Sequence, residues 1–407
     1  MSKNLISWES VLLSVLLLVV GWLTVTGGTT AGYLVPEDSL YLRAKVLSVE
    51  DHEGEFEGDV TLSFRAQARI DGKKQTLDAV WSYSSYASFN PLPVEKGDRV
   101  VIASYDGGET WHFTDHVRSD ALLVLLVIFF GALIIFGRKK GLKTVVSLTL
   151  TVMAVLLVFI PAVMLGKSIY LWSVLTCVYI TVMTLCIVNG IGPMSLAAII
   201  GCSGGVLASL LITVVTDAFI HLTGQAGDGA VYLSAMNPDF DLVGLVYGSI
   251  IIGSVGAVMD VAVDISASLK ELTVKMGGAD AKTLFRSGLN IGRDVIGTMS
   301  NTLVLAYIGG SMSSVILFIY NFGTSPIQLF NYESLVIEIL CFLVGSLGIL
   351  FTLPLTSAGC ALKYTRPRAL EKLRAEDVGN ENRVDEYTQT LEQISNIKIG
   401  AEYEKRM

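Results

Sequence analysis

Two aspartates, Asp260 and Asp264, interrupt an otherwise apolar stretch of the chain. They are four residues apart, so they share one face of a helix, and Gly253 and Gly256 continue that face. Small residues of this kind let a second helix approach closely. Two carboxylates one turn apart in apolar surroundings do not both ionise easily, so one of them can hold a proton or a cation. The alternative is that the helix leaves the membrane near Asp264, so that the two acids lie at its cytoplasmic end in water.

A second polar group begins the next apolar stretch. Asp294 and Asn301 follow one helical face there, with Gly297 beside them and Arg293 just before. If this end packs against the helix that carries the two aspartates, these side chains form one polar cluster, with Arg293 as the counter-ion. Asp294 also has a simpler explanation as an acid in the first turn of a helix, where the helix dipole stabilises it.

The composition places these acids in a membrane protein. Apolar residues (AVILMFWYC) make up 52% of the 407 residues, charged residues only 16%, and the mean hydropathy is +0.59. The apolar residues fall in runs of about 20, the length that crosses roughly 30 Å of hydrocarbon. These features exclude a soluble enzyme and a disordered chain. With a net charge of −8 and no basic patch in the sequence, nucleic-acid binding is not expected.

The apolar runs predict a polytopic, all-α membrane bundle of about eight transmembrane helices. Lys and Arg gather in the loops after the second, sixth and eighth runs, whereas loops 221–241 and 322–333 contain neither. Because basic loops stay in the cytoplasm, both termini are expected to be cytoplasmic in a cell membrane. The predicted spans are roughly 11–31, 120–137, 144–166, 169–189, 193–220, 242–264, 296–320 and 334–357.

Residues 33–119 form the one stretch that resembles a soluble domain, and the topology puts it outside the cytoplasm. Alternating apolar and polar residues, separated by turn signals, predict a small all-β domain of the OB type, with a small sandwich as the alternative. His112 and His116 are four residues apart, as zinc-binding histidines on a helix are, but no HExxH glutamate accompanies them. No metal site is therefore expected. The predicted strands are 41–49, 60–70, 75–83 and 99–104.

The remaining segments complete the predicted domain organisation. Residues 1–32 are expected to be a transmembrane anchor, with a cleaved signal peptide as the alternative. Residues 120–362 hold the other seven spans, and apolar residues at helical spacing predict an amphipathic cytoplasmic linker within 265–292. The charged residues 363–407 are expected to form a cytoplasmic tail.

Familiar enzyme motifs do not occur in this sequence. There is no Walker loop, no GxSxG motif and no dinucleotide fingerprint. The five cysteines lie in apolar runs and form no CxxC pattern. We therefore expect neither an enzyme nor a bound cofactor.

Two runs carry a resemblance to a known family: Gly253-Ser-Val-Gly-Ala-Val-Met-Asp260-Val-Ala-Val-Asp264-Ile-Ser-Ala-Ser and Gly292-Arg-Asp-Val-Ile-Gly-Thr-Met-Ser-Asn301-Thr-Leu-Val-Leu-Ala-Tyr. They resemble the YibE/F family of multi-span bacterial membrane proteins. The anchor and external domain look like the YibE half, so the resemblance implies a shorter YibF-like membrane partner. The order of the elements is also faintly similar to SecF and RND-type halves. Neither resemblance names a substrate.

Two functions remain open from the sequence. In the first, the chain is part of an ion-coupled transporter or permease, in which Asp260 and Asp264, with Asp294 and Asn301, handle protons or cations in the lipid bilayer. In the second, it is a non-catalytic membrane assembly or envelope factor that acts through its external domain.

Overall fold

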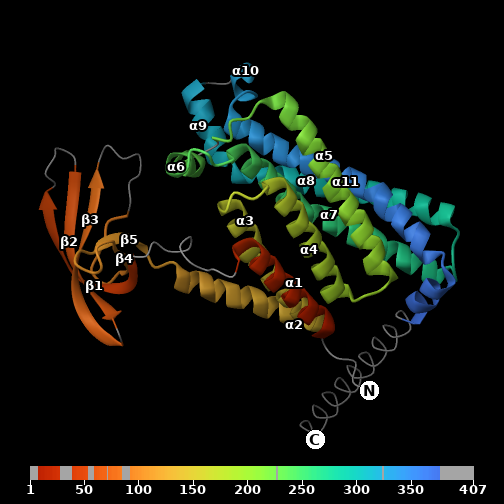
Figure 1. Cartoon of the computed structure of the whole chain (residues 1–407), viewed down its shortest axis with the longest axis horizontal. Coiled ribbons are helices and arrows are strands. Elements are labelled where there is room, and N and C mark those ends of the chain that lie inside the picture. Colours follow the sequence, from red (N-terminus) through yellow and green to blue (C-terminus); the bar gives the residue numbers. More distant parts are fainter. Residues whose placement is uncertain are drawn as a thin grey trace, which may run out of the picture. The chain divides into compact units, whose positions relative to one another are not determined.

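The computed structural model describes residues 8–27, 39–53, 59–70, 72–84, 92–225, 228–322 and 325–375. It divides the chain into two compact units. One comprises residues 29–138 and contains the β domain. The other comprises residues 1–28 and 139–407 and contains most of the helices (Figure 1).

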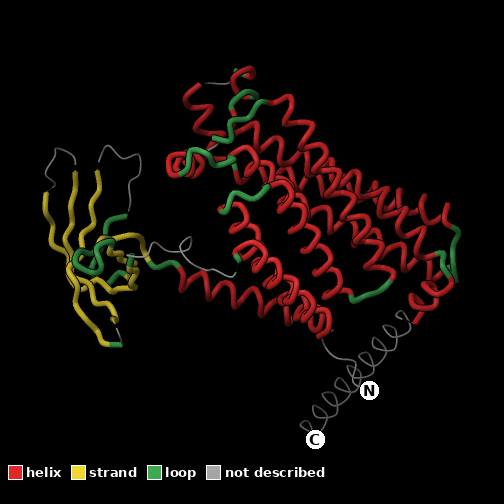
Figure 2. Tube along the Cα trace, viewed as in Figure 1, coloured by secondary structure: helices red, strands yellow, loops and turns green. Residues whose placement is uncertain are grey.

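The β domain is a closed barrel of five strands in the order β1-β2-β3-β5-β4 (Figure 2). The predicted barrel is confirmed and the sandwich alternative is wrong. All pairs are antiparallel except β3 with β5. Inward-pointing side chains such as Phe64, Val100 and Ile102 fill the barrel and are 0 to 2% exposed. The strands are β1 Leu40–Glu53, β2 Asp59–Ile70, β3 Lys73–Ser84, β4 Arg99–Ser104 and β5 His112–His116.

The remainder of the described chain is almost entirely helical. The elements are α1 Trp8–Thr26, α2 Ser119–Ala154, the π-helical η1 Val155–Phe159, α3 Ile160–Met164, α4 Ile169–Asn189, α5 Pro193–Ile220, α6 Asp228–Met236, α7 Leu242–Lys275, α8 Ala281–Gly310, α9 Met312–Phe322, α10 Pro326–Leu329 and α11 Glu333–Tyr364. Figure 1 shows α4, α5, α7, α8 and α11 as neighbouring rods.

Six stretches of helix among the described residues are long and apolar enough to cross a membrane, or seven if the bent pair of α8 and α9 counts as one. The predicted number of eight is therefore not reached by this measure. One of the six, Ser119–Met164, has 46 residues and would be about 69 Å long, more than twice the hydrocarbon thickness. Its backbone is non-helical at Arg138, where φ is 48°, so it is two helices joined at a break.

The predicted span 296–320 is likewise not one straight helix. The second half of α8 forms it together with α9, and the two are bent by 58°. The break falls at Ser311, which follows Gly309 and Gly310. Two consecutive glycines weaken a helix locally and allow this change of direction.

The centre of the bundle is the interface between α5 and α11. Glycines and hydroxyl residues recur there every four residues on both helices, and each glycine faces a hydroxyl side chain. A Cβ atom on any of these glycines would lie 2.3 Å or less from the facing oxygen, so the helices are in close backbone contact. The pairs are Gly201 with Thr356, Gly205 with Thr352, and Gly348 with Ser209.

The segment predicted as an amphipathic linker belongs to two long helices in the structure. α7 runs without a break to Lys275, and Ile265 and Leu269 are fully buried in the core of the bundle. Gly277 and Gly278 then turn the chain with φ of 68° and 124°, a conformation that glycine adopts without strain. α8 begins after Asp280, whose carboxylate accepts a hydrogen bond from the Thr283 amide at 3.2 Å.

The first part of the predicted tail is helical, from residue 367 to residue 375. Its Leu373 is fully buried in the core of the bundle, and Arg374 donates a hydrogen bond to the Gly277 carbonyl. Residues 376–407 of the predicted tail lie outside the described residues, as do residues 1–7 and 28–38.

Candidate functional site

The position of Asp260 along the bundle follows from the contacts of α7 with α4. Gly248 packs directly against Ile169, the first residue of α4. Tyr247 and Tyr170 stack beside this contact, with ring centroids 6.4 Å apart. Because the helices run in the same direction, Asp260 lies at the level of Thr181, each being twelve residues beyond its contact residue.

The contacts of α5 with α4 and α7 independently place Asp260 at the level of Thr181. α5 runs opposite to both helices, and its Cys202 lies 3.3 Å from the Thr181 hydroxyl. Three residues further along α5, Gly205 contacts Val258 of α7. Thr181 is therefore level with the residues just after Val258, which again gives Asp260.

α4 has 21 residues, a length of about 31 Å, and Thr181 lies two residues from its midpoint. Asp260 is thus level with the middle of α4, a helix that contains no charged residue.

The contacts of α7 with α8 bring the second polar group to the same level. Gly288 packs against Leu269, and Gly292 against Ile265. The helices are antiparallel in this region, so Asp260 is level with Gly297 and Asp264 with Arg293. The structure therefore places the two predicted groups of residues at one depth.

Among the described residues, the side chains predicted to form one polar cluster make no hydrogen bond across the two helices. Asp260, Asp264, Asp294, Arg293 and Asn301 are all exposed on the bundle. Arg293 donates to Asn290, 3.2 Å away on its own helix, and not to a carboxylate. In the part of the chain that the structure describes, neither aspartate of α7 has an ion pair or a side-chain hydrogen bond. The counter-ion role of Arg293 stays a prediction.

The three glycines predicted to mark helix packing behave differently from one another. A Cβ atom on Gly253 would lie 2.8 Å from the Tyr307 hydroxyl of α8, so this glycine is a point of close approach. Gly256 and Gly297 have no other residue within 4 Å of such an atom. Gly256 lies one turn before Asp260 on α7. Gly297 lies on α8 at the same level as Asp260. The face that carries the acids is therefore open, and we call Gly256, Asp260, Asp264 and Gly297 the open acidic face.

The alternative explanation, that the helix leaves the membrane near Asp264, stays a prediction, because α7 has 34 residues, about 51 Å, and is longer than the hydrocarbon core of a bilayer. The helix continues for eleven residues beyond Asp264, and Ile265, Leu269 and Thr273 on its inner side are fully buried. Asp260 and Asp264 lie on the opposite, exposed side of the same helix.

The histidines of the barrel do not form the arrangement that the metal alternative requires. His112 and His116 lie at the two ends of β5, where a rise of about 3.4 Å per residue separates them by about 14 Å. His116 instead lies 3.8 Å from Asp98. Among the described residues, no group of three or more potential metal ligands occurs.

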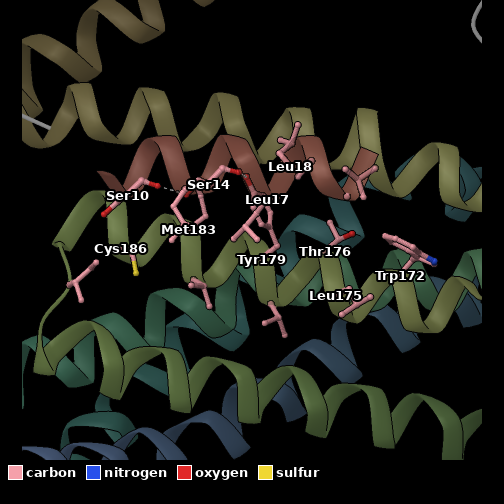
Figure 3. Close-up of a pocket in the computed structure, with 17 residues that line it drawn as sticks. Ser10, Ser14, Leu17, Leu18, Trp172, Leu175, Thr176, Tyr179, Met183 and Cys186 are labelled. Atoms are coloured by element: carbon pink, nitrogen blue, oxygen red, sulfur yellow. Dashed lines mark hydrogen bonds between the residues drawn. The ribbon is translucent and has the colours of Figure 1, made fainter. Parts of the chain in front are cut away.

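Sequence reasoning missed an apolar cavity of about 370 Å³ between α1 and α4 (Figure 3). Side chains such as Leu17, Leu18 and Met183 line it, and the Tyr179 hydroxyl donates to the Ser14 carbonyl at 2.9 Å, which ties the two helices together. The cavity walls contain no charged residue, so the cavity can hold hydrocarbon but not an ion. No periodic signal in the sequence marks it, because both helices are apolar on all sides.

A family model described as YibE/F-like protein matches residues 125–366, which include α3 to α11 and most of α2. No curated protein and no solved structure matches the chain. The matched region contains the open acidic face and excludes the barrel.

Proposed function

Taking as a premise that the chain belongs to the YibE/F-like protein family, we propose that it is an integral membrane component of an ion-coupled transporter or permease. The observation that carries this proposal is the depth of Asp260. It lies level with the middle of α4, a helix of 21 residues without a single charge. Acidic side chains inside a membrane are costly and are generally kept for ion or proton pathways.

The proposed topology has eight spans. The helix Ser119–Met164 contributes two, one on each side of the break at Arg138, and the bent pair of α8 and α9 contributes one. Arg138, Lys139, Lys140 and Lys143 surround the first break, which suits a cytoplasmic turn. With eight spans in a cell membrane, both termini are cytoplasmic and the barrel lies outside.

The chemistry proposed for the open acidic face is reversible neutralisation. In low dielectric a lone carboxylate is unstable, and it becomes stable when it takes up a proton or a cation. Asp264, one turn away on the same side of α7, disfavours a second negative charge at the site. The pair can therefore exchange one positive charge, which is the elementary step of ion coupling.

An open face with carboxylates at this depth requires a cover. Gly256 and Gly297 leave room for a helix to approach within backbone distance. We propose that the cover is the YibF-like membrane partner, and that it provides the hydrogen-bond donors that this chain does not. A complex copurified in mild detergent and lost on Gly256→Leu substitution supports this partner. A chain that stays monomeric under the same conditions argues against it.

The test of the transport proposal is a charge-neutral substitution. Vesicles that contain the chain and its partner are loaded with a pH-sensitive dye, and the rate of proton movement is followed after a pH step. We expect Asp260→Asn to reduce the rate at least about tenfold, because it removes the ionisable group, and Asp260→Glu to retain part of it. Glu271→Gln is the matched control, since Glu271 lies on the same helix but pairs with Lys275 at 2.6 Å. A full rate in Asp260→Asn contradicts the proposal.

The second candidate function is membrane assembly through the barrel. The observation that favours it is that the barrel is a separate unit with its own hydrophobic core, outside the region that the family model matches. A chain without residues 39–116 then loses its cellular effect, whereas Asp260→Asn keeps it. The transport proposal predicts the loss for Asp260→Asn.

A further inference from the structure

One side of the barrel carries a groove of about 270 Å³ beside the beginning of α2. Five basic side chains line it, and we call them the basic cradle. Residues 33–119 contain fifteen acidic and nine basic residues, so this domain is acidic as a whole, yet more than half of its bases line one groove. The cradle consists of Arg43, Lys45, Arg69, Lys74 and Arg99.

The strand register puts like charges directly opposite each other in the cradle. Lys45 of β1 is paired with Arg99 of β4. Arg69 of β2 is paired with Lys74 of β3. Like charges at directly opposed positions destabilise a sheet. A fold that keeps two such pairs side by side gives up stability there, which a bound anion would restore.

The groove contains too little negative charge to balance these bases. Its acidic residue is Asp120, which pairs with Arg43 at 3.1 Å and with Arg99 at 3.0 Å. Both pairs are largely exposed to solvent and therefore weak. Among the described residues, Lys45, Arg69 and Lys74 form no ion pair. The cradle thus keeps a net positive charge that faces the solvent.

The location of the cradle indicates the kind of anion. Val117 and Asp120 line the groove, and α2 begins between them at Ser119. The next residues of α2, from Leu122 to Phe129, are 48 to 63% exposed and entirely apolar. If α2 enters the bilayer as proposed above, the cradle lies at the membrane surface, where the phosphates of lipid headgroups are.

We propose that the basic cradle binds the phosphate group of an anionic lipid headgroup. Arginine guanidinium groups bind phosphate oxygens through two parallel hydrogen bonds, and lysines add point charges. The N-terminus of α2, which runs without a break from Ser119 to the bend at Arg138, adds a favourable dipole. This inference rests on the membrane insertion of α2 but not on any role of Asp260, so the two proposals fail separately.

Lysine acetylation in nanodiscs tests the cradle in the full chain. One set of discs contains phosphatidylcholine alone, and the other contains equal parts of phosphatidylcholine and phosphatidylglycerol. We expect Lys45 and Lys74 to react at least about fivefold more slowly in the anionic discs, because a bound headgroup covers their amines. Lys96, an exposed lysine of the same barrel outside the groove, should react equally in both and reports that the barrel is folded.

A pair of variants separates specific binding from a general surface effect. Arg69→Gln removes one base of the cradle, so the protection of Lys45 and Lys74 should fall. Arg65→Gln is the control, because Arg65 is on the same strand but lies outside the groove and pairs with Glu50. Equal protection in the two variants overturns the proposal.

The source of the phosphate is decided by a soluble probe. Pyrophosphate is added to discs of phosphatidylcholine, and protection is measured at the same two lysines. Protection by the anionic discs at physiological salt supports the lipid headgroup. Protection by pyrophosphate alone overturns the lipid assignment, and protection by neither overturns the cradle as an anion site.

Discussion

The interface of α5 with α11 and the open acidic face use the same residue pattern with opposite results. In both, small or polar residues recur every four positions on facing sides of two helices. At the α5–α11 interface, Gly201 and Gly205 receive the hydroxyl side chains of the opposite helix. On the open acidic face, Gly256 and Gly297 face nothing within 4 Å. The difference shows that the same pattern of small residues marks a closed helix contact in one place and an open surface in another, and that only the structure distinguishes the two.

The largest effect is expected from filling the closed interface. A Cβ atom at Gly205 would lie 1.9 Å from the Thr352 hydroxyl and 3.1 Å from the Gly348 carbonyl, so Gly205→Leu forces the helices apart. We expect it to lower the free energy of unfolding by about 3 kcal/mol, the upper end for overpacking a core. Thermal unfolding in detergent measures this.

The matched substitution on the open face sharpens the comparison. Gly256→Leu places the same side chain where no neighbour lies, so the stability of the isolated chain should change by less than about 0.5 kcal/mol. The partner complex, in contrast, should be lost. Equal destabilisation by the two variants would mean that the faces do not differ in the way described.

A smaller effect is expected at Asp106, a carboxylate that, unlike Asp260, is stabilised by hydrogen bonds within the chain. Asp106, in the loop between β4 and β5, accepts hydrogen bonds from the Ser104 hydroxyl at 2.6 Å and from the amides of Glu109 and Thr110 at 3.0 Å. The Ser104 hydroxyl, followed by the Thr110 hydroxyl and amide, holds the pKa of Asp106 well below its ordinary value.

The sign of the resulting pH dependence follows directly. A lowered folded-state pKa stabilises the loop at all pH values above the ordinary pKa of about 4, and this contribution is lost as the pH falls through the folded-state value. We expect the Thr110 amide to stay protected from hydrogen exchange between pH 7 and about pH 4.5, and to lose protection only at more acidic pH. In Asp106→Asn, protection should be weaker at pH 7 and should not change over this range. A wild-type loop that opens near pH 6 contradicts the assignment.

The sequence predicted the elements better than their contacts. Apolar runs and strand alternation are local properties, so most spans and four of the five strands were predicted with small errors in their ends. β5 was missed because His112–His116 is short and mixes polar and apolar residues. The break at Arg138 was placed correctly between two spans, because basic residues interrupt the apolar run there.

Features that depend on register lay beyond the sequence. That Asp260 is level with Thr181 follows from where Gly248 meets Ile169, which only packing decides. The basic cradle has the same origin, since Lys45 and Arg99 are far apart in the chain and meet through strand pairing. The bases of the groove are scattered along the sequence, so no basic run predicts the groove that they form in the folded domain.

The depth of position 260 is the claim on which this account depends most, and thiol labelling measures it directly. In a chain whose five native cysteines are replaced, Asp260→Cys and Met276→Cys are treated with a membrane-impermeant maleimide in vesicles, with the cytoplasmic side accessible. Met276 is the control because it caps the end of the same helix and is 54% exposed. We predict labelling at position 260 to be at least about tenfold slower, because a thiol in low dielectric seldom ionises. Equal labelling at the two positions would place the carboxylate in cytoplasmic water and contradict a role within the membrane.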